Sequence, residues 1–246
     1  MRAIIIREPG GTGVLQLDER PDPTLGPEDL MVQVQASGLN RADLLQRRGL
    51  YPAPPGSPAD IPGLELAGEV VEVGERVTRF AVGDRVMGIV GGGACAERAT
   101  LHQDVALTIP EGMSWSSAAA IPEAFLTAYD AAVLQGGLSA GHWLVVNAVG
   151  SGVGTAAVQI ARVLGARTVG SSRTETKLPR AQMLGLDHPV HGTSESLPEV
   201  VRSLTDGAGA QVAVDLVGGP GLSAMMKCLS RRGTLVLVGL LDGAKA

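Results

Sequence analysis

The sequence predicts an α/β protein in which a small β-barrel precedes a doubly wound parallel sheet. Three observations carry this prediction: a high glycine content, a change of pattern near residue 114, and a glycine-rich turn between a strand and a helix. The chain has 246 residues, including 34 Gly, with 45% hydrophobic, 18% charged and only 2% aromatic residues. This composition excludes general disorder, and the length suits one large domain or two modest ones.

Charge and cysteine content exclude several classes of function. The formal net charge is −5 and no basic patch is apparent in the sequence, so nucleic acid is a poor candidate partner. The two cysteines, Cys95 and Cys228, cannot build a disulfide framework. Neither a signal peptide nor an uninterrupted apolar stretch of about 18 residues is present, which predicts a cytoplasmic protein without a membrane span.

Short strands and turns dominate the first part of the chain. Alternating or β-branched runs predict strands over 2–7, 14–20, 30–36, 66–73 and 85–90. Gly74 and Gly83 interrupt the later strands, and one helix is expected over 40–48. We therefore predict a small twisted barrel, which forms a first domain over 1–122.

From residue 114 onward, helices alternate with short apolar strands. An Ala-rich helix is expected over 116–134. Strands are then expected over 143–147, 167–171, 189–190, 211–215 and 233–238, and helices over 152–164, 175–184, 197–204 and 221–229. This alternation is typical of a doubly wound parallel sheet and predicts a second domain over 123–246.

A glycine-rich turn lies between the first of these strands and its helix. It reads Gly150-Ser151-Gly152-Val153-Gly154. Glycines let backbone N–H groups approach a pyrophosphate, and the N-terminus of the helix adds partial positive charge. A strict G-x-G-x-x-G is absent, because Val149 and Ser151 occupy its first two glycine positions. The turn therefore predicts a dinucleotide site, with an ordinary tight turn as the alternative.

The end of the next strand favours NADPH over NADH. NAD-specific sites place Asp or Glu here to hold the ribose 2′-hydroxyl. This strand instead ends in two serines and Arg173, with Lys177 one helical turn further on. Hydroxyls and two cations suit a 2′-phosphate. The neighbouring Glu175 argues mildly against this reading, and a solvated start of the helix remains the alternative.

Five segments together resemble one family: 40–52 (NRADLLQRRGLYP), 61–65 (IPGLE), 121–128 (IPEAFLTA), 151–154 (SGVG) and 215–219 (DLVGG). The chain resembles the medium-chain dehydrogenase/reductase superfamily, specifically its zinc-independent quinone oxidoreductase branch and, within it, the p53-inducible type. The resemblance implies an α/β fold with a GroES-like β-barrel domain followed by a Rossmann doubly wound parallel sheet. That sheet is expected to lack its last strand, because the family continues beyond Ala246. The chain is thus expected to be truncated at its C-terminus, without the segment through which family members form homodimers.

The resemblance also assigns roles to individual residues. It implies that Asn40 and Tyr51 lie beside the nicotinamide and donate hydrogen bonds to the acceptor oxygen. A helix cap is the alternative for Asn40, and packing in a Pro-rich loop is the alternative for Tyr51. The other residues expected to bind the cofactor, beside the turn and the two cations, are Thr127, His191, Val217, Gly218, Gly239 and Leu240. Of these, His191 is expected to substitute for a tyrosine that many relatives use near the 2′-phosphate.

No metal ion is expected. Zinc-dependent relatives have Cys where Asn40 stands and His where Leu64 stands, so two ligands are missing. Without a Lewis acid, an electron-poor acceptor such as a quinone is the favoured substrate. The sequence therefore predicts an NADPH-dependent, zinc-independent quinone oxidoreductase. The alternatives are an enone or enoyl-thioester reductase, for which no basic patch suited to coenzyme A phosphates is apparent, and an NADPH-binding protein without turnover.

Overall fold

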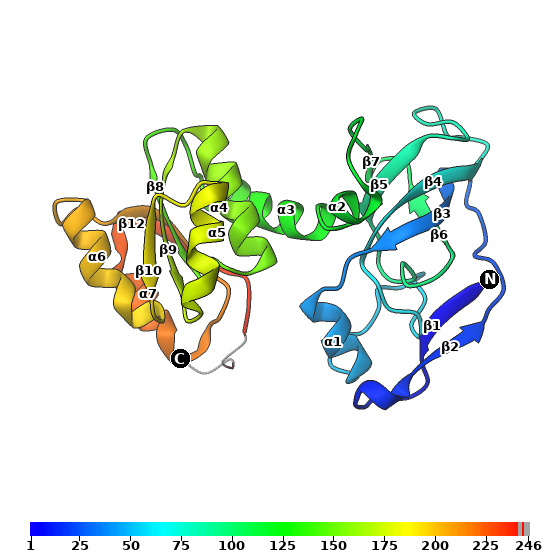
Figure 1. The fold of residues 1–246 in the computed structure, drawn as a ribbon, viewed down its shortest axis with the longest axis horizontal. Coiled ribbons are helices and arrows are strands. Elements are labelled where there is room, and N and C mark those ends of the chain that lie inside the picture. Colours follow the sequence, from blue (N-terminus) through cyan, green and yellow to red (C-terminus); the bar gives the residue numbers. More distant parts are fainter. Residues whose placement is uncertain (241–242, 244–246) are drawn as a thin grey trace. The chain divides into compact units, whose positions relative to one another are not determined.

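The computed structural model describes residues 1–240 and 243, and it divides the chain into two compact units (Figure 1). The first unit spans Met1–Glu123 and the second spans Ala124–Ala246. Residues 241–242 and 244–246, which belong to the predicted second domain, lie outside the described residues. Each unit has its own hydrophobic clusters.

The first unit contains a five-stranded antiparallel sheet. Its strands are β3 (Asp29–Ser37), β4 (Glu65–Val73), β5 (Arg85–Ile89), β6 (Arg98–His102) and β7 (Ala106–Thr108), in the order β6-β3-β4-β5-β7. A separate hairpin is formed by β1 (Arg2–Ile6) and β2 (Leu15–Glu19), with a short 3-10 turn over Thr12–Val14. The strands β6 and β7 were not expected from the sequence, because they are short and flanked by polar residues.

Alternation places the apolar residues of this sheet on its inner face. Leu30, Val32, Leu66, Val70 and Val86 are fully buried and pack in one cluster. The first helix, α1 (Arg41–Arg47), follows β3 as the sequence predicted. The start of α1 lies next to the buried strand β4, and Asn40, Asp43 and Glu65 meet there.

The single long helix expected over 116–134 is wrong. The structure forms α2 (Trp115–Ala119), α3 (Pro122–Tyr129) and a π-helical stretch over Asp130–Gln135. Pro122 has no N–H to donate, and its ring disfavours helical geometry at Ile121, so the helix is interrupted there. The break places the N–H of Glu123 in a new turn of helix, where it serves the polar cluster described below.

The second unit contains a five-stranded sheet in which every described pair is parallel. The strands β8 (Trp143–Asn147), β9 (Arg167–Ser172), β10 (His188–His191), β11 (Ala210–Asp215) and β12 (Leu229–Leu237) follow the order β10-β9-β8-β11-β12. The connecting helices are α4 (Gly152–Leu164), α5 (Leu178–Leu184), α6 (Leu197–Leu204) and α7 (Leu222–Lys227). Short 3-10 turns precede the last three of them, over Glu175–Lys177, Ser194–Ser196 and Gly219–Gly221.

Helices cover both faces of the parallel sheet (Figure 1), and the side chains of β8 alternate between two clusters. Leu144 and Val146 pack with α4 and α5 on one face. Trp143 and Val145 pack with α6 and α7 on the other. Doubly wound sheets bind ligands at the carboxyl ends of their strands, so this arrangement defines the edge where a site is expected.

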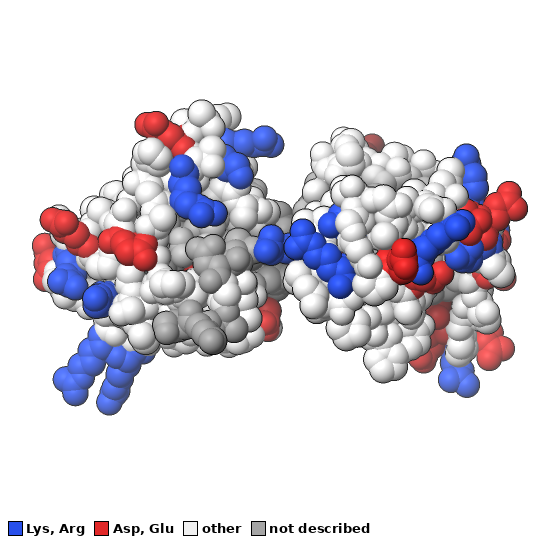
Figure 2. All heavy atoms as spheres, turned by 90° about the horizontal axis from the view of Figure 1, so that it is seen from below, with Lys and Arg blue, Asp and Glu red and all other residues white. Residues whose placement is uncertain are grey.

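Two surface properties bear on possible partners. In the described part of the chain, no helix has both the length and the apolar character needed to cross a membrane. On the face drawn in Figure 2, acidic and basic side chains are interspersed, and neither sign forms a continuous field over either unit. This face therefore offers no extended basic surface of the kind that nucleic acid requires.

Candidate functional site

The turn between β8 and α4 has the geometry of a phosphate cradle. Ser151 is the N-cap of α4, and its Oγ accepts a hydrogen bond of 3.1 Å from the N–H of Gly154. Ala148, which begins the turn, has a φ of 59°, in the left-handed region that non-glycine residues rarely adopt. Such strain is maintained where the surrounding structure fixes the backbone for a function.

Gly154 is required by close packing rather than by flexibility. A Cβ at this position would lie 2.7 Å from the Cα and the O of Val149, so the helix could not approach the turn as it does. Among the described residues, no protein acceptor is found for the N–H groups of Gly152 and Val153. Two free N–H groups at the start of a 13-residue helix form a site suited to a phosphate.

A pocket of about 340 Å³ extends from this turn along the carboxyl ends of the strands. Its lining comes from four loops and consists of Asn147, Ala148, Gly150, Ser151, Ser172, Arg173, Thr174, Lys177, Gly192, Thr193, Ser194, Glu195, Val217, Gly218, Pro220 and Gly221. Six of these were predicted from the sequence: Gly150, Ser151, Arg173, Lys177, Val217 and Gly218. The pocket therefore brings the phosphate turn and the two predicted cations to one place.

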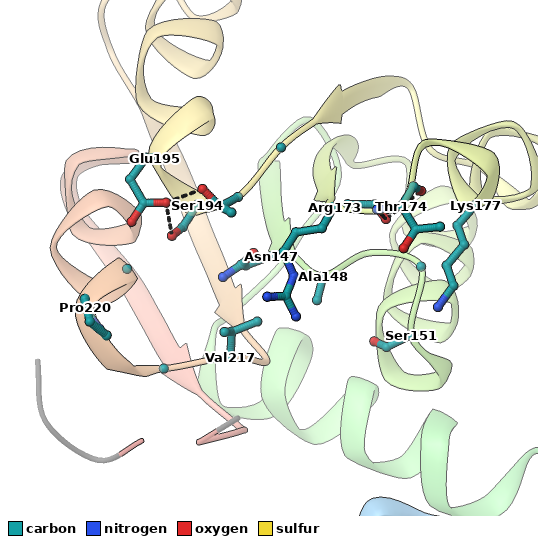
Figure 3. A pocket seen from close by; sticks show the side chains of 16 residues that line it. Asn147, Ala148, Ser151, Arg173, Thr174, Lys177, Ser194, Glu195, Val217 and Pro220 are labelled. Carbon is teal, nitrogen blue, oxygen red and sulfur yellow. Dashed lines mark hydrogen bonds between the residues drawn. The ribbon is translucent and has the colours of Figure 1, made fainter. Parts of the chain in front are cut away.

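The two cations occupy different parts of the pocket. Figure 3 shows the Arg173 side chain directed into the pocket, whereas Lys177 lies on the side of Ser151. The stem of Lys177 covers the turn so closely that a Cβ on Gly150 would lie 2.8 Å from Lys177 Cδ. Neither residue belongs to an ion pair in the described part of the chain, so both charges are available to an anionic ligand.

Sequence reasoning missed the acidic residue of the pocket. Glu195 stands across the pocket from Lys177 (Figure 3), and its carboxylate accepts hydrogen bonds from the hydroxyls of Thr193 and Ser194. These bonds, first that of Thr193, lower the pKa of Glu195, so it is ionised at neutral pH. Glu195 could not be recognised from the sequence pattern, because it lies in a short 3-10 turn after β10, outside any motif. Glu175, the acidic residue noted in the sequence, does not line the pocket.

A buried polar network fixes the ends of three strands beneath the pocket. Asn147 Nδ2 donates to Asp215 Oδ1 at 3.0 Å, and Ser171 Oγ donates to Asn147 Oδ1 at 3.0 Å. The same Asp215 oxygen accepts from the N–H groups of Val217 at 2.9 Å and Gly218 at 3.2 Å. Asp215 is fully buried, and its Oδ2 has no partner among the described residues. The network holds the loop of Val217 and Gly218 in place at the pocket.

The remaining predicted cofactor residues surround this pocket or lie apart from it. His191 Nε2 is 3.3 Å from the carbonyl oxygen of Arg173. The His191 side chain therefore contacts the backbone of the loop that carries Arg173. Gly239 and Leu240 adjoin Gly218, where a Cβ would lie 2.9 Å from Gly239 O and 3.1 Å from Leu240 Cδ2. Thr127 lies in α3, half-buried, and does not line the pocket.

Asn40 and Tyr51 belong to the first unit, on either side of α1. Asn40 is the N-cap residue of α1, as the alternative interpretation expected, and its N–H donates to Asp43 Oδ2 at 2.7 Å. Its side chain makes a further contact, because Asn40 Nδ2 donates to Glu65 Oε1 at 2.7 Å. Tyr51 is 41% exposed, and no hydrogen bond joins its side chain to another described residue.

Glu65 and Asp43 link Asn40 to the rest of the first unit. Glu65 Oε2 accepts from the N–H of Glu123 at 2.8 Å, and Asp43 Oδ1 accepts from the N–H of Gly63 at 2.9 Å. Burial raises the pKa of Glu65 despite these hydrogen bonds, and burial followed by the charge of Glu65 raises the pKa of Glu123. No group of three His, Cys, Asp or Glu with metal-binding geometry occurs in the part of the chain that the structure describes.

Comparison with known proteins covers both units. The sequence profile of the alcohol dehydrogenase GroES-like domain matches residues 26–131, and that of the zinc-binding dehydrogenase family matches residues 152–246. The chain is 37% identical to a quinone oxidoreductase-like protein 2 homolog of Nematostella vectensis, over 98% of this chain and 66% of the relative. It is 35% identical to a quinone oxidoreductase of Pseudomonas aeruginosa, over 95% of this chain and 72% of the relative.

A solved structure agrees with these matches. The quinone oxidoreductase of Escherichia coli complexed with NADPH superimposes with a TM-score of 0.88 at 31% identity, covering 100% of this chain and 75% of that chain. This chain spans about two thirds or less of the length of the first curated relatives, 66% of the Nematostella protein and 63% of a human VAT-1 homolog. The resemblance inferred from the sequence is confirmed: the chain belongs to the medium-chain dehydrogenase/reductase superfamily, among its quinone oxidoreductase-like members.

Proposed function

We propose that this chain is an NADPH-dependent oxidoreductase that reduces quinones without a metal ion. One observation carries the proposal: the pocket joins a phosphate cradle to Arg173 and Lys177, both without an ion-pair partner among the described residues. A dinucleotide with an additional phosphate uses both features, whereas a dinucleotide without it uses only the cradle. The NADPH complex of the Escherichia coli relative supports this choice of cofactor.

The residues of the second unit bind and orient the cofactor in this proposal. The free N–H groups of Gly152 and Val153 receive the pyrophosphate, and Arg173 pairs with the 2′-phosphate. Lys177, which covers Gly150, adds positive charge beside the turn. When bound, NADPH supplies a hydride to the acceptor.

The residues of the first unit favour an acceptor that needs little activation. Leu64 cannot ligate a metal ion, and the Asn40 amide is held by Glu65 rather than free to rearrange. A quinone accepts hydride readily because its product is a stabilised hydroquinone anion, which takes up one proton from solvent. Catalysis then depends mainly on positioning the two reactants.

The first test is the loss of NADPH absorbance on addition of a small ortho-quinone to the purified chain, with NADH as the matched control. We expect NADPH to be oxidised at least about tenfold more efficiently than NADH, because only NADPH engages Arg173. Equal rates with both cofactors would contradict the role of the two cations.

Absence of turnover has a separate interpretation. If titration of NADPH into the chain shows binding but no acceptor is reduced, the chain is a nucleotide-binding protein without catalytic activity. If NADPH does not bind, the assignment of the pocket is wrong. The binding and turnover measurements therefore separate the enzyme from its non-enzymatic alternative.

A second candidate function is the reduction of an enoyl thioester, and one observation favours it. Exposed arginines stand at both ends of α1 between Asn40 and Tyr51: Arg41 is its first residue and Arg48 is its C-cap. In the described part of the chain neither guanidinium belongs to an ion pair. Their guanidinium groups suit the phosphates of coenzyme A.

The two candidates differ in their response to removal of these arginines. If a trans-2-enoyl-CoA is the substrate, the double variant Arg41→Ala, Arg48→Ala raises its KM about tenfold. The KM for an uncharged quinone serves as the control and stays the same. Turnover of quinones but not of enoyl-CoA by the unmodified chain removes this candidate.

A further inference from the structure

The Asn40 amide is held by a carboxylate that the proposed reaction does not itself use. Glu65 opens β4 and is only 3% exposed. Each of its oxygens has one donor, Asn40 Nδ2 at 2.7 Å and the N–H of Glu123 at 2.8 Å. Gly38 makes room for this contact, because a Cβ there would lie 2.0 Å from Glu65 Oε1.

Both oxygens of Glu65 act as hydrogen-bond acceptors, and this fixes the orientation of the amide. Asn40 must turn Nδ2 toward Glu65, since its Oδ1 in the same place would face another acceptor oxygen. In the capping box at the start of α1, Oδ1 of Asn40 faces the N–H of Asp43. An amide oxygen has two lone pairs, so Oδ1 can accept one further hydrogen bond from a ligand, and the second N–H of Asn40 has no partner among the described residues. Donation to an anion also increases the electron density of the amide, which makes Oδ1 the stronger of the two groups.

We propose that Glu65 is a positioning residue that makes Asn40 a hydrogen-bond acceptor toward the bound ligand. The matching ligand group is a donor, such as a primary carboxamide N–H or a hydroxyl. This inference rests on the proposed function for the identity of the ligand, but not for the orientation of the amide. It reverses the role expected from the sequence, in which Asn40 donates to the acceptor oxygen.

The surroundings explain why a carboxylate rather than a neutral amide performs this task. A Gln at position 65 could present either its oxygen or its NH2 group to Asn40, so both orientations of Asn40 would be populated.

The charged or titratable groups that face Glu65 are Asp43 on α1 and Glu123 on α3. Cys95 lies beside Asp43 and Ser37. None of these groups is a cation.

The orientation can be measured without catalysis, from the side-chain amide signals in a 1H–15N correlation spectrum of the full chain. The Asn40 pair is assigned by its disappearance in Asn40→Ala. We expect one of its protons to be shifted strongly downfield by Glu65, and to move upfield in Glu65→Gln. The matched control is Glu69→Gln, an exposed residue of the same strand, which leaves the pair unchanged. An Asn40 pair that does not respond to Glu65→Gln would overturn the proposal.

Kinetics then test whether the orientation matters for the reaction. With NADPH and a quinone, we expect Glu65→Gln to lower kcat/KM about tenfold, and to have no further effect in an Asn40→Ala background. Additive losses would mean that Glu65 acts independently of Asn40, which contradicts a positioning role. If no variant turns over, including the unmodified chain, the proposed function fails, while the spectroscopic result still decides the proposal on Glu65.

Discussion

The two polar sites of this chain are built in opposite ways. In the second unit, the phosphate turn uses backbone N–H groups and two cations, and its residues come from one continuous segment and the end of the next strand. In the first unit, the side-chain amide of Asn40 donates to the buried carboxylate of Glu65, and its backbone N–H donates to that of Asp43. The first site is electropositive and suited to phosphates, whereas the second is anionic and controls the orientation of a neutral group.

The difference teaches which kind of site a sequence reveals. The phosphate turn is local, so its pattern is legible in a dozen consecutive residues. Glu65 contacts Asn40, which is 25 positions away in the sequence, and Glu123, which is 58 positions away. No spacing rule predicts such contacts, because they depend on the register of β4 and on the break at Pro122.

The largest effect is expected from removal of the buried carboxylate beneath the pocket. Asp215→Ala leaves the amide of Asn147 and the N–H groups of Val217 and Gly218 without their acceptor. We expect the free energy of unfolding to fall by about 3 kcal/mol, measured by chemical denaturation. Asp215→Asn keeps an oxygen at the Oδ1 position, so its loss should be clearly smaller. Equal losses in both variants would show that the network does not depend on this acceptor.

A smaller loss is expected when the turn is crowded. Gly154→Ala places a Cβ 2.7 Å from the backbone of Val149, which cannot move freely. We expect a loss of about 2 kcal/mol in unfolding free energy together with weaker NADPH binding. For the unfolding free energy, Gly152→Ala is the matched control, because its Cβ would meet only Ala124 Cβ at 3.8 Å. Similar behaviour of the two variants would refute the argument from close packing.

The cations of the pocket are tested by cofactor selectivity rather than by stability. Arg173→Ala should weaken NADPH binding about tenfold and leave NADH binding nearly unchanged, because only NADPH carries the 2′-phosphate. Fluorescence titration gives both dissociation constants. Arg180→Ala, an exposed arginine of α5 outside the pocket, is the control. A parallel loss for both cofactors would place Arg173 at the pyrophosphate instead.

The smallest effect is a pH dependence of the folding stability, which arises from Glu65 in the first unit. Burial raises the pKa of Glu65 above its ordinary value of 4.5, so the folded chain holds this proton more tightly than the unfolded chain. Its contribution to stability is therefore complete at pH values below 4.5 and is lost as the pH rises through the pKa of the folded state. Gln does not titrate, so the stability of Glu65→Gln relative to the unmodified chain should rise with pH over this window. Thermal unfolding at several pH values measures the difference, and a constant difference would contradict the raised pKa.

Much of the fold could be predicted from the sequence, and six of the residues predicted to bind the cofactor line one pocket. The strands β1 to β5, the helix α1 and the parallel sheet were expected near their observed positions, because their apolar periodicity is regular. The prediction of one long helix over 116–134 was wrong, because it followed the Ala-rich composition and did not allow for the break at Pro122. Glu195 was missed because a residue in a short loop carries no periodic signal.

The sequence by itself determined the fold class and the family, and it predicted the phosphate turn with Arg173 and Lys177. These features depend on the order of residues along short segments, where backbone geometry and periodicity act locally. Only the tertiary structure decided that Glu65 reaches Asn40 and that Asp215 organises three strand ends. Hydrogen bonds between buried groups depend on distance and angle in space, and these are fixed only when strands and helices have packed.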